Sequence, residues 1–209
     1  MKKLHILLFI LFTTFTISNG QFIKFGGGLG VTTGFPFHDM SWNYNKSGHF
    51  DVFLKSVFDL SLPVQLSPSI TFFIPHTTKV GDLFGSSTYT VSTIMFDFNG
   101  HYVFNSLDRF EFYGLAGIDI LVAWKKEVYK TNGTEPVTHT TREHDNGLGL
   151  NVGAGTYMKI TEQIDLFAEA KYVIYGKDKL FFSHYNQFMF NTGVLINLKW
   201  LTKNENPGK

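Results

Sequence analysis

The chain has 209 residues, a net charge of +1 and no cysteine, so disulfide bonds and thiolate chemistry are excluded and nothing indicates a nucleic-acid partner. Aromatic residues make up 17% of the chain, with 23 Phe, a high share even for a β protein. The length suits one domain.

The first twenty residues have the pattern of a secretory signal peptide. Two lysines follow Met1, and the segment Leu4–Phe15 is apolar except for one histidine and two threonines. A short polar stretch then ends in the small residue Gly20. The apolar segment is short for crossing a bilayer, so we predict cleavage after Gly20 rather than an N-terminal membrane anchor.

Eight later segments alternate between apolar residues and polar or small ones. In the first segment, Phe25 and Leu29 have one parity, whereas Lys24 and several glycines have the other. Successive side chains of a strand point to opposite faces, so each segment predicts a strand with one apolar face. The predicted strands are Phe22–Thr33, Asp51–Leu62, Ser69–Pro75, Thr88–Phe104, Phe110–Trp124, Asn146–Ile160, Ile164–Tyr175 and Phe188–Trp200.

The predicted connections alternate between long and short. The short ones are Pro63–Pro68, Asn105–Asp108 and Thr161–Gln163. Bacterial outer-membrane barrels have an even strand number, short periplasmic turns and longer extracellular loops, with both termini then in the periplasm. The predicted long, extracellular loops are Phe35–His49, His76–Ser87, Lys125–Asp145 and Gly176–Asn186.

The direction in which the apolar residues face distinguishes a soluble barrel from a membrane-spanning one. In a soluble barrel the apolar parity would face inward, and the aromatic residues Phe112, Phe188 and Trp200 would crowd the edge of the core. A transmembrane barrel instead has lipid outside, a polar lumen and aromatic girdles at the interfaces. We therefore predict an all-β fold, an eight-stranded antiparallel up-and-down transmembrane β-barrel over residues 21–200, followed by a polar tail at 201–209. A soluble lipocalin-like barrel that binds a small ligand is kept as an alternative.

Three segments resemble a known family. The runs Y-G-L-A-G-I-D at 113–119, G-L-G-L-N-V-G-A-G at 147–155 and F-A-E-A-K-Y at 167–172 are similar to the small outer-membrane β-barrel proteins of bacteroidetes. The resemblance covers most of residues 21–200 and implies the barrel fold and an outer-membrane location, but no chemistry. One departure is that such barrels usually end on the aromatic residue of the last strand, whereas here a tail follows Trp200.

Charged residues recur on the inward parity of the predicted strands. One interpretation is an ion path or a catalytic carboxylate pair, and the other is a structural network of buried ion pairs. An eight-stranded barrel is only wide enough for side chains to fill, which favours the structural network. The predicted network consists of Lys24, Lys55, Asp59, Asp97, Glu111, Asp119, Glu169, Lys171 and Lys199.

Two further groups of polar residues carry weaker signals for chemistry. His139, Arg142, Glu143, His144 and Asp145 cluster in one predicted loop, but their spacing matches no zinc motif. Ser183-His184 and the run from His38 to Ser41 supply the residue types of a rim-located lipid-modifying hydrolase, without a G-x-S-x-G signature. We therefore predict no cofactor, no metal and no catalytic residue, and keep the hydrolase as an alternative.

The expected role is structural or adhesive, because binding on a rigid scaffold usually resides in its loops. The expected partners are outer-membrane lipid and an extracellular ligand or envelope protein that contacts the long loops. We expect no enzymatic activity and no open pore.

Overall fold

The computed structural model describes residues 22–36, 49–61, 63–81, 85–131, 137–175 and 185–198. The predicted signal peptide, Lys199, Trp200 and the tail lie outside these residues, as do most of the first and last predicted long loops. In the described part no helix is long and apolar enough to cross a membrane.

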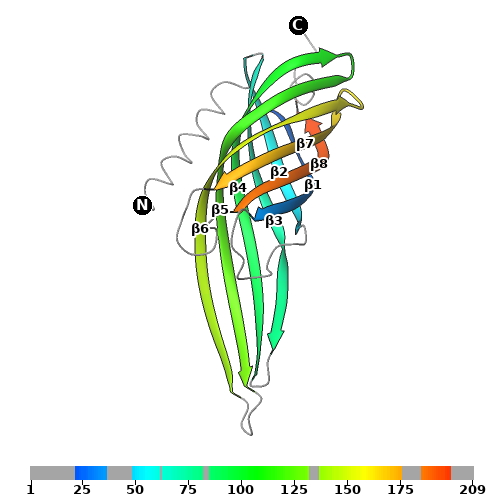
Figure 1. The fold of residues 1–209 in the computed structure, drawn as a ribbon. Helices are drawn as coiled ribbons and strands as arrows, with labels where there is room; N and C mark the ends of the chain where they lie inside the picture. Colours follow the sequence, from blue (N-terminus) through cyan, green and yellow to red (C-terminus); the bar gives the residue numbers. More distant parts are fainter. Residues whose placement is uncertain are drawn as a thin grey trace, which may run out of the picture.

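Eight antiparallel strands close into one barrel, as predicted (Figure 1). Each strand pairs with the next along the chain, and β1 pairs with β8 to complete the ring. The strands are β1 Phe22–Pro36, β2 His49–Ser61, β3 Val64–Gly81, β4 Gly85–Leu107, β5 Phe110–Thr131, β6 Thr138–Lys159, β7 Ile164–Tyr175 and β8 Tyr185–Asn197.

Glycines allow β1 and β8 to approach closely where the ring closes. Gly28 lies directly opposite Gly193 in the β1–β8 ladder. A Cβ atom on Gly28 would lie 2.0 Å from the carbonyl oxygen of Thr192, which is main chain and cannot move aside. The inward-facing glycines of β1 are therefore a condition for closing the barrel at this seam.

The predicted loops His76–Ser87 and Lys125–Asp145 are wrong, because most of their residues extend the strands. β5 continues to Thr131, and its ladder with β6 is unbroken from Lys125↔Glu143 to Lys130↔Thr138. Likewise β3 begins at Val64, so the predicted connection at residues 63–68 is shorter than expected. These extensions lie beyond the closed part of the barrel. They do not need an apolar face there, so both of their faces are largely polar.

The extensions of four strands form a sheet that we call the blade. It consists of residues 76–81 of β3, 85–91 of β4, 125–131 of β5 and 138–143 of β6. The ladder between β2 and β3 ends at the Asp51↔Phe73 pair, and the ladder between β6 and β7 ends at Gly149↔Tyr175. Beyond these pairs the outer edges of β3 and β6 have no partner strand among the described residues. Figure 1 shows the blade running well past the other strands.

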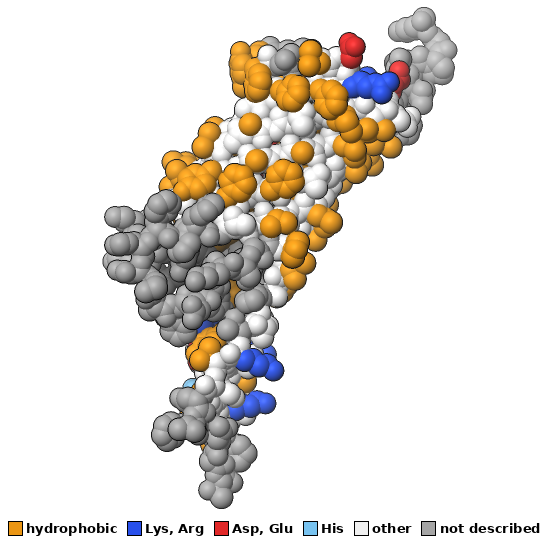
Figure 2. All heavy atoms as spheres, turned by 45° about the vertical axis from the view of Figure 1, so that its right-hand side comes forward, with side chains coloured by type: hydrophobic (Ala, Val, Ile, Leu, Met, Phe, Trp, Pro, Cys, Tyr) orange, Lys and Arg blue, Asp and Glu red, His pale blue; other side chains and the backbone are white. Residues whose placement is uncertain are grey.

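The apolar parity faces outward, as predicted. Ile118 of β5 and Val152 of β6 are 43% and 56% exposed, and Figure 2 shows hydrophobic side chains over the closed part of the barrel. The soluble lipocalin-like alternative, which needs this parity inside, is therefore wrong. One residue departs from the pattern: Phe58 has the same parity as the exposed Val52 and Leu54 but is only 8% exposed. It pairs with Phe22 beside an irregularity of the ladder, and such a bulge bends the strand locally.

Candidate functional site in the barrel lumen

The lumen is packed with side chains along its length. Two apolar clusters occupy it. On β7 the buried polar residues Glu169 and Lys171 lie between Phe167 of the first cluster and Val173 of the second. Every member of both clusters is buried. The first cluster contains Phe53, Val57, Tyr113, Leu115, Tyr157, Phe167 and Leu195, and the second contains Met95, Leu121, Val173, Tyr175 and Met189.

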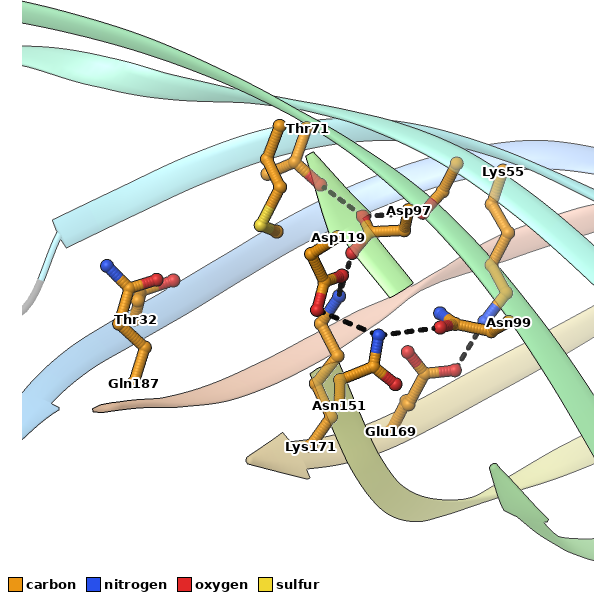
Figure 3. A network of polar contacts seen from close by, with 12 residues as sticks. Thr32, Lys55, Thr71, Asp97, Asn99, Asp119, Asn151, Glu169, Lys171 and Gln187 are labelled. Carbon is orange, nitrogen blue, oxygen red and sulfur yellow. Dashed lines mark hydrogen bonds and ion pairs between the residues drawn. The ribbon is translucent and has the colours of Figure 1, made fainter. Parts of the chain in front are cut away.

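Lys171 joins two carboxylates that come from neighbouring strands. Its Nζ atom forms an ion pair with Asp97 and lies 3.4 Å from Oδ1 of Asp119. Asp97 and Asp119 are direct partners in the β4–β5 ladder, so both carboxylates enter the lumen at one level. All three side chains are at most 1% exposed. A buried charge is tolerated only when it is paired and hydrogen-bonded, and this cluster meets that requirement (Figure 3).

Neutral donors complete the coordination of the same carboxylates. Ser69 Oγ donates to Asp97 over 2.9 Å, and Thr71 Oγ1 donates to the same oxygen over 3.4 Å. The Nδ2 atom of Asn151 lies 2.8 Å from Oδ2 of Asp119 and 2.8 Å from Oδ1 of Asn99, so it donates to both. The cluster thus connects five strands, β3 to β7, across the lumen.

A second ion pair lies beside the first. Lys55 pairs with Glu169, and the hydroxyl of Tyr113 donates to Oε2 of Glu169 over 3.1 Å. The ring of His101 stacks on Tyr113 with 4.3 Å between ring centroids, and its Nδ1 atom lies 2.9 Å from the Tyr157 hydroxyl oxygen. The charged pair is therefore enclosed by aromatic rings, which fill this part of the lumen.

A third group lies at the end of the barrel that carries the short turns. Lys24 Nζ is 2.8 Å from Oδ2 of Asp165 and 3.8 Å from Oε2 of Glu111. The same ammonium lies over the ring of Tyr157, 4.5 Å from its centroid, in a cation–π contact. Glu111 is partly exposed, so this group marks the boundary between lumen and solvent.

The structure brings together seven of the nine residues predicted for the lumen network, namely Lys24, Lys55, Asp97, Glu111, Asp119, Glu169 and Lys171. Of the other two, Asp59 accepts a 3.1 Å hydrogen bond from Gln65, and Lys199 lies outside the described residues.

Sequence reasoning missed several members of the network. Asp165 pairs with Lys24, and Asp51 accepts a 3.1 Å hydrogen bond from Thr32; both acids are buried. Their parity alone was enough to place them inside. His101 and Tyr157 were also on the inward parity, but their contact requires a register between β4 and β6 that parity cannot supply.

The residues predicted as weaker candidates for catalysis or metal binding point to opposite faces of a strand or lie outside the described part of the chain. Each carboxylate of the three ion pairs is held by a lysine. No group of three histidine, cysteine or acidic residues in the described part is arranged to hold a metal ion. His139 and His144, which the sequence placed in one loop, belong to strand β6 with opposite parity and so point to opposite faces. Ser183, His184 and the run from His38 to Ser41 lie outside the described residues.

Comparison with known proteins agrees with this architecture. The model of the outer membrane protein beta-barrel domain family matches residues 6–197. No curated protein sequence matches the chain.

Solved structures show the same fold at low sequence identity. Ail, the attachment invasion locus protein of Yersinia pestis, crystallised with the heparin analogue sucrose octasulfate, is 12% identical with a TM-score of 0.55, over 85% of this chain and 98% of Ail. A major outer membrane protein of Thermus thermophilus is 11% identical with a TM-score of 0.55, over 84% and 99%. OprG of Pseudomonas aeruginosa is 10% identical with a TM-score of 0.51, over 85% and 95%. With the apolar outer surface and the buried ion pairs of the lumen described above, the family match shows that this chain is an outer-membrane protein of the β-barrel domain family.

Proposed function

We propose that the protein is a non-enzymatic scaffold of the outer membrane that presents its blade and long loops to a ligand outside the cell. The observation that carries this proposal is the contrast between a lumen closed by buried side chains and a sheet extended well beyond it. A packed lumen leaves the exposed end as the part available for contact. Ail, on a similar fold, is named for attachment and was crystallised with a heparin analogue, which gives a precedent for adhesion.

The lumen is proposed to be non-conducting. The aromatic rings of Tyr113, Tyr157 and Phe167 are each at most 2% exposed, and ion pairs join β7 to β2 and to β4. Eight-stranded barrels have an interior just wide enough for side chains to fill. Ions would have to break buried salt bridges to pass, which is costly.

The orientation is proposed from the lengths of the connections. The turns between β2 and β3, β4 and β5, and β6 and β7 are short, whereas the blade lies at the opposite end. In bacterial barrels the short turns face the periplasm, so the blade faces the outside and both termini face the periplasm. We also retain residues 1–20 as a signal peptide and the bacteroidete-type affiliation as proposals, supported by the sequence patterns.

The test compares attachment by cells that express the full protein or a variant in which residues 126–142 are replaced by a short Gly/Ser turn. Attachment is measured on immobilised extracellular-matrix proteins, sulfated glycans and purified envelope proteins. The proposal expects at least one surface on which the wild type attaches and the shortened variant does not. A variant with the short turn at residues 161–163 replaced by Gly-Ser-Gly is the control and should attach like the wild type. Attachment that persists without residues 126–142, which we call the blade hairpin, would contradict the proposal.

A further inference from the structure

The two faces of the blade differ in charge. One face continues the lumen side of the strands, and the other continues the side that faces lipid. In β5 the lumen parity includes the buried Leu121 and Ala123, followed by Lys125 and Glu127. The lipid parity includes Ile120 and Val122, followed by Trp124, Lys126, Val128 and Lys130. We call these the inner face and the outer face of the blade.

The charged side chains of the inner face contact neighbours on the same face. Lys125 Nζ lies 3.6 Å from Oε2 of Glu143, its direct partner in the ladder, and 5.2 Å from the centroid of the Tyr89 ring. Ser87 Oγ donates to Glu127 over 3.3 Å. Glu127 and Glu143 are thus both engaged on the inner face, and they are the two glutamates of the described part of the blade.

Among the described residues of the blade, the outer face carries cations and no acid. The pairing register places Lys79, Lys126, Lys130 and Arg142 on it, next to threonine, serine and valine. Figure 2 shows basic side chains standing out from the blade. None of these four cations forms an ion pair with a described residue. Lys126 and Arg142 are both exposed.

Two of these cations lie directly opposite each other. Lys126 and Arg142 are Cα partners in the β5–β6 ladder, and both belong to the outer face. Like charges at directly opposed positions destabilise an antiparallel pair. An anion placed between an ammonium and a guanidinium would remove this repulsion, and the guanidinium offers the fork geometry that phosphate oxygens match.

The cation pair lies next to the lipid-facing surface. Trp124, 44% exposed, precedes Lys126 by two residues on the same face and pairs with His144. Exposed tryptophans mark the interface between hydrocarbon and water, so Trp124 fixes the level of the bilayer surface. Lys126 lies two residues beyond Trp124, roughly 7 Å along the strand, which is the depth of the lipid head groups.

We infer that Lys126 and Arg142 bind the phosphate of a lipid head group in the leaflet through which the blade emerges, with Lys79 and Lys130 adding to the attraction. The orientation proposed above makes this the outer leaflet, whose lipids in Gram-negative bacteria carry phosphate. A lipid fits better than a soluble polyanion because the pair adjoins the apolar surface and faces away from the inner face. The inference does not rest on adhesion, because the bound lipid anchors the base of the blade rather than its tip.

The test uses the full protein, purified in a non-ionic detergent and titrated with diphosphoryl lipid A, with the same lipid stripped of its phosphates, or with inorganic phosphate. Binding is read from the rise of the thermal unfolding midpoint with ligand concentration. The variant Lys126→Gln/Arg142→Gln is compared with Arg109→Gln/Lys159→Gln. The latter removes one arginine and one lysine, both exposed, at the opposite end of the barrel. The single variants Lys126→Gln and Arg142→Gln serve if the double variant folds poorly.

We expect the wild type and the Arg109→Gln/Lys159→Gln control to bind the phosphorylated lipid equally. The Lys126→Gln/Arg142→Gln variant should bind roughly thirtyfold more weakly, and each single variant about fivefold more weakly. Binding should weaken with added salt. Equal binding by all variants, or equal binding of the dephosphorylated lipid, would overturn the inference. So would an equal effect of inorganic phosphate, which would assign the site to a soluble anion. Measurement in detergent is independent of orientation, so an error in orientation would appear only in a protease experiment on whole cells.

Discussion

The lumen and the outer face of the blade are built from the same strands but treat charge in opposite ways. In the lumen, β5 and β6 contribute Asp119 and Asn151, which are buried and connected to Lys171. In the blade, the same two strands present Lys126 and Arg142 to solvent with no described counter-charge. A charge buried in the lumen is costly unless it is paired or hydrogen-bonded, whereas a charge on the outer face of the blade is exposed and available to a partner. The comparison separates residues that hold the barrel together from residues that contact the surroundings.

The largest contrast is expected from one substitution made in both regions. Lys171→Met leaves Asp97 and Asp119 buried without their cation, and breaking a buried pair in this way costs about 3–5 kcal/mol. Lys126→Met removes an exposed ammonium and should change the free energy of unfolding by no more than about 0.5 kcal/mol. Unfolding by urea in detergent is measured on a gel, where the folded barrel in an unboiled sample migrates faster than the unfolded protein. Equal loss of stability in both variants would abolish the distinction between the two regions.

The next contrast tests which side faces lipid. Ile118→Arg places a charge on the lipid-facing side of the closed barrel, which costs about 2–4 kcal/mol near the centre of the bilayer. Val128→Arg makes a similar change on the outer face of the blade, which lies beyond the membrane, and should have little effect. The folded fraction in isolated outer membranes reports the outcome. A stable Ile118→Arg barrel would mean that this parity does not contact lipid.

A smaller effect is expected from removing one hydroxyl in the lumen. Tyr113→Phe deletes the 3.1 Å hydrogen bond to Glu169, and hydrogen bonds to charged groups contribute about 1.5–3 kcal/mol. Tyr102 lies on the same barrel but is 57% exposed on its outer surface, so Tyr102→Phe is the matched control. Unfolding in urea should show a loss for Tyr113→Phe only. A loss confined to Tyr102→Phe would contradict the description of the lumen.

The smallest effect on stability is expected from shortening the blade hairpin. Replacing residues 131–141 by a short Gly/Ser linker removes the ends of β5 and β6. These ends pair with residues 127–130 of β5 and with Gly85 of β4, and none of them belongs to either lumen cluster. The closed barrel has no free edge and should keep its heat-modifiable band. Protease added to whole cells should cut the wild-type hairpin and leave the turns at residues 108–109 and 161–163 intact. Disappearance of the band in the shortened variant would show that the blade supports the barrel.

Sequence alone was sufficient for most of the closed part of the barrel because each lipid-facing strand must alternate, although residues 64–68 of β3 were predicted as a connection. The predicted strand at residues 164–175 has the same first and last residue as the observed β7. Its alternating apolar residues are flanked on both sides by short polar segments, which define the two ends. The blade was not predictable in the same way. Its strands are polar on both faces, so Lys125–Asp145 was interpreted as a loop although threonine, valine and tyrosine in it favour strands.

The lumen network was predictable as a set but not as pairs. Parity placed Lys55, Glu169 and Lys171 inside, yet Lys55 and Glu169 are separated by 114 residues in the chain. Which lysine meets which acid depends on the stagger of eight strands around the ring, and a sequence pattern with a period of two does not contain that stagger.

A lumen closed by packed side chains should not conduct ions, and recording in a planar lipid bilayer measures this property. Purified full-length protein is added to the bilayer, and current is recorded at fixed voltage, with a trimeric porin as the positive control. The packed ion pairs and aromatic rings predict no reproducible, long-lived conductance step from this protein. Steps of constant size that recur between preparations and persist at steady voltage would contradict the packed lumen and indicate a channel.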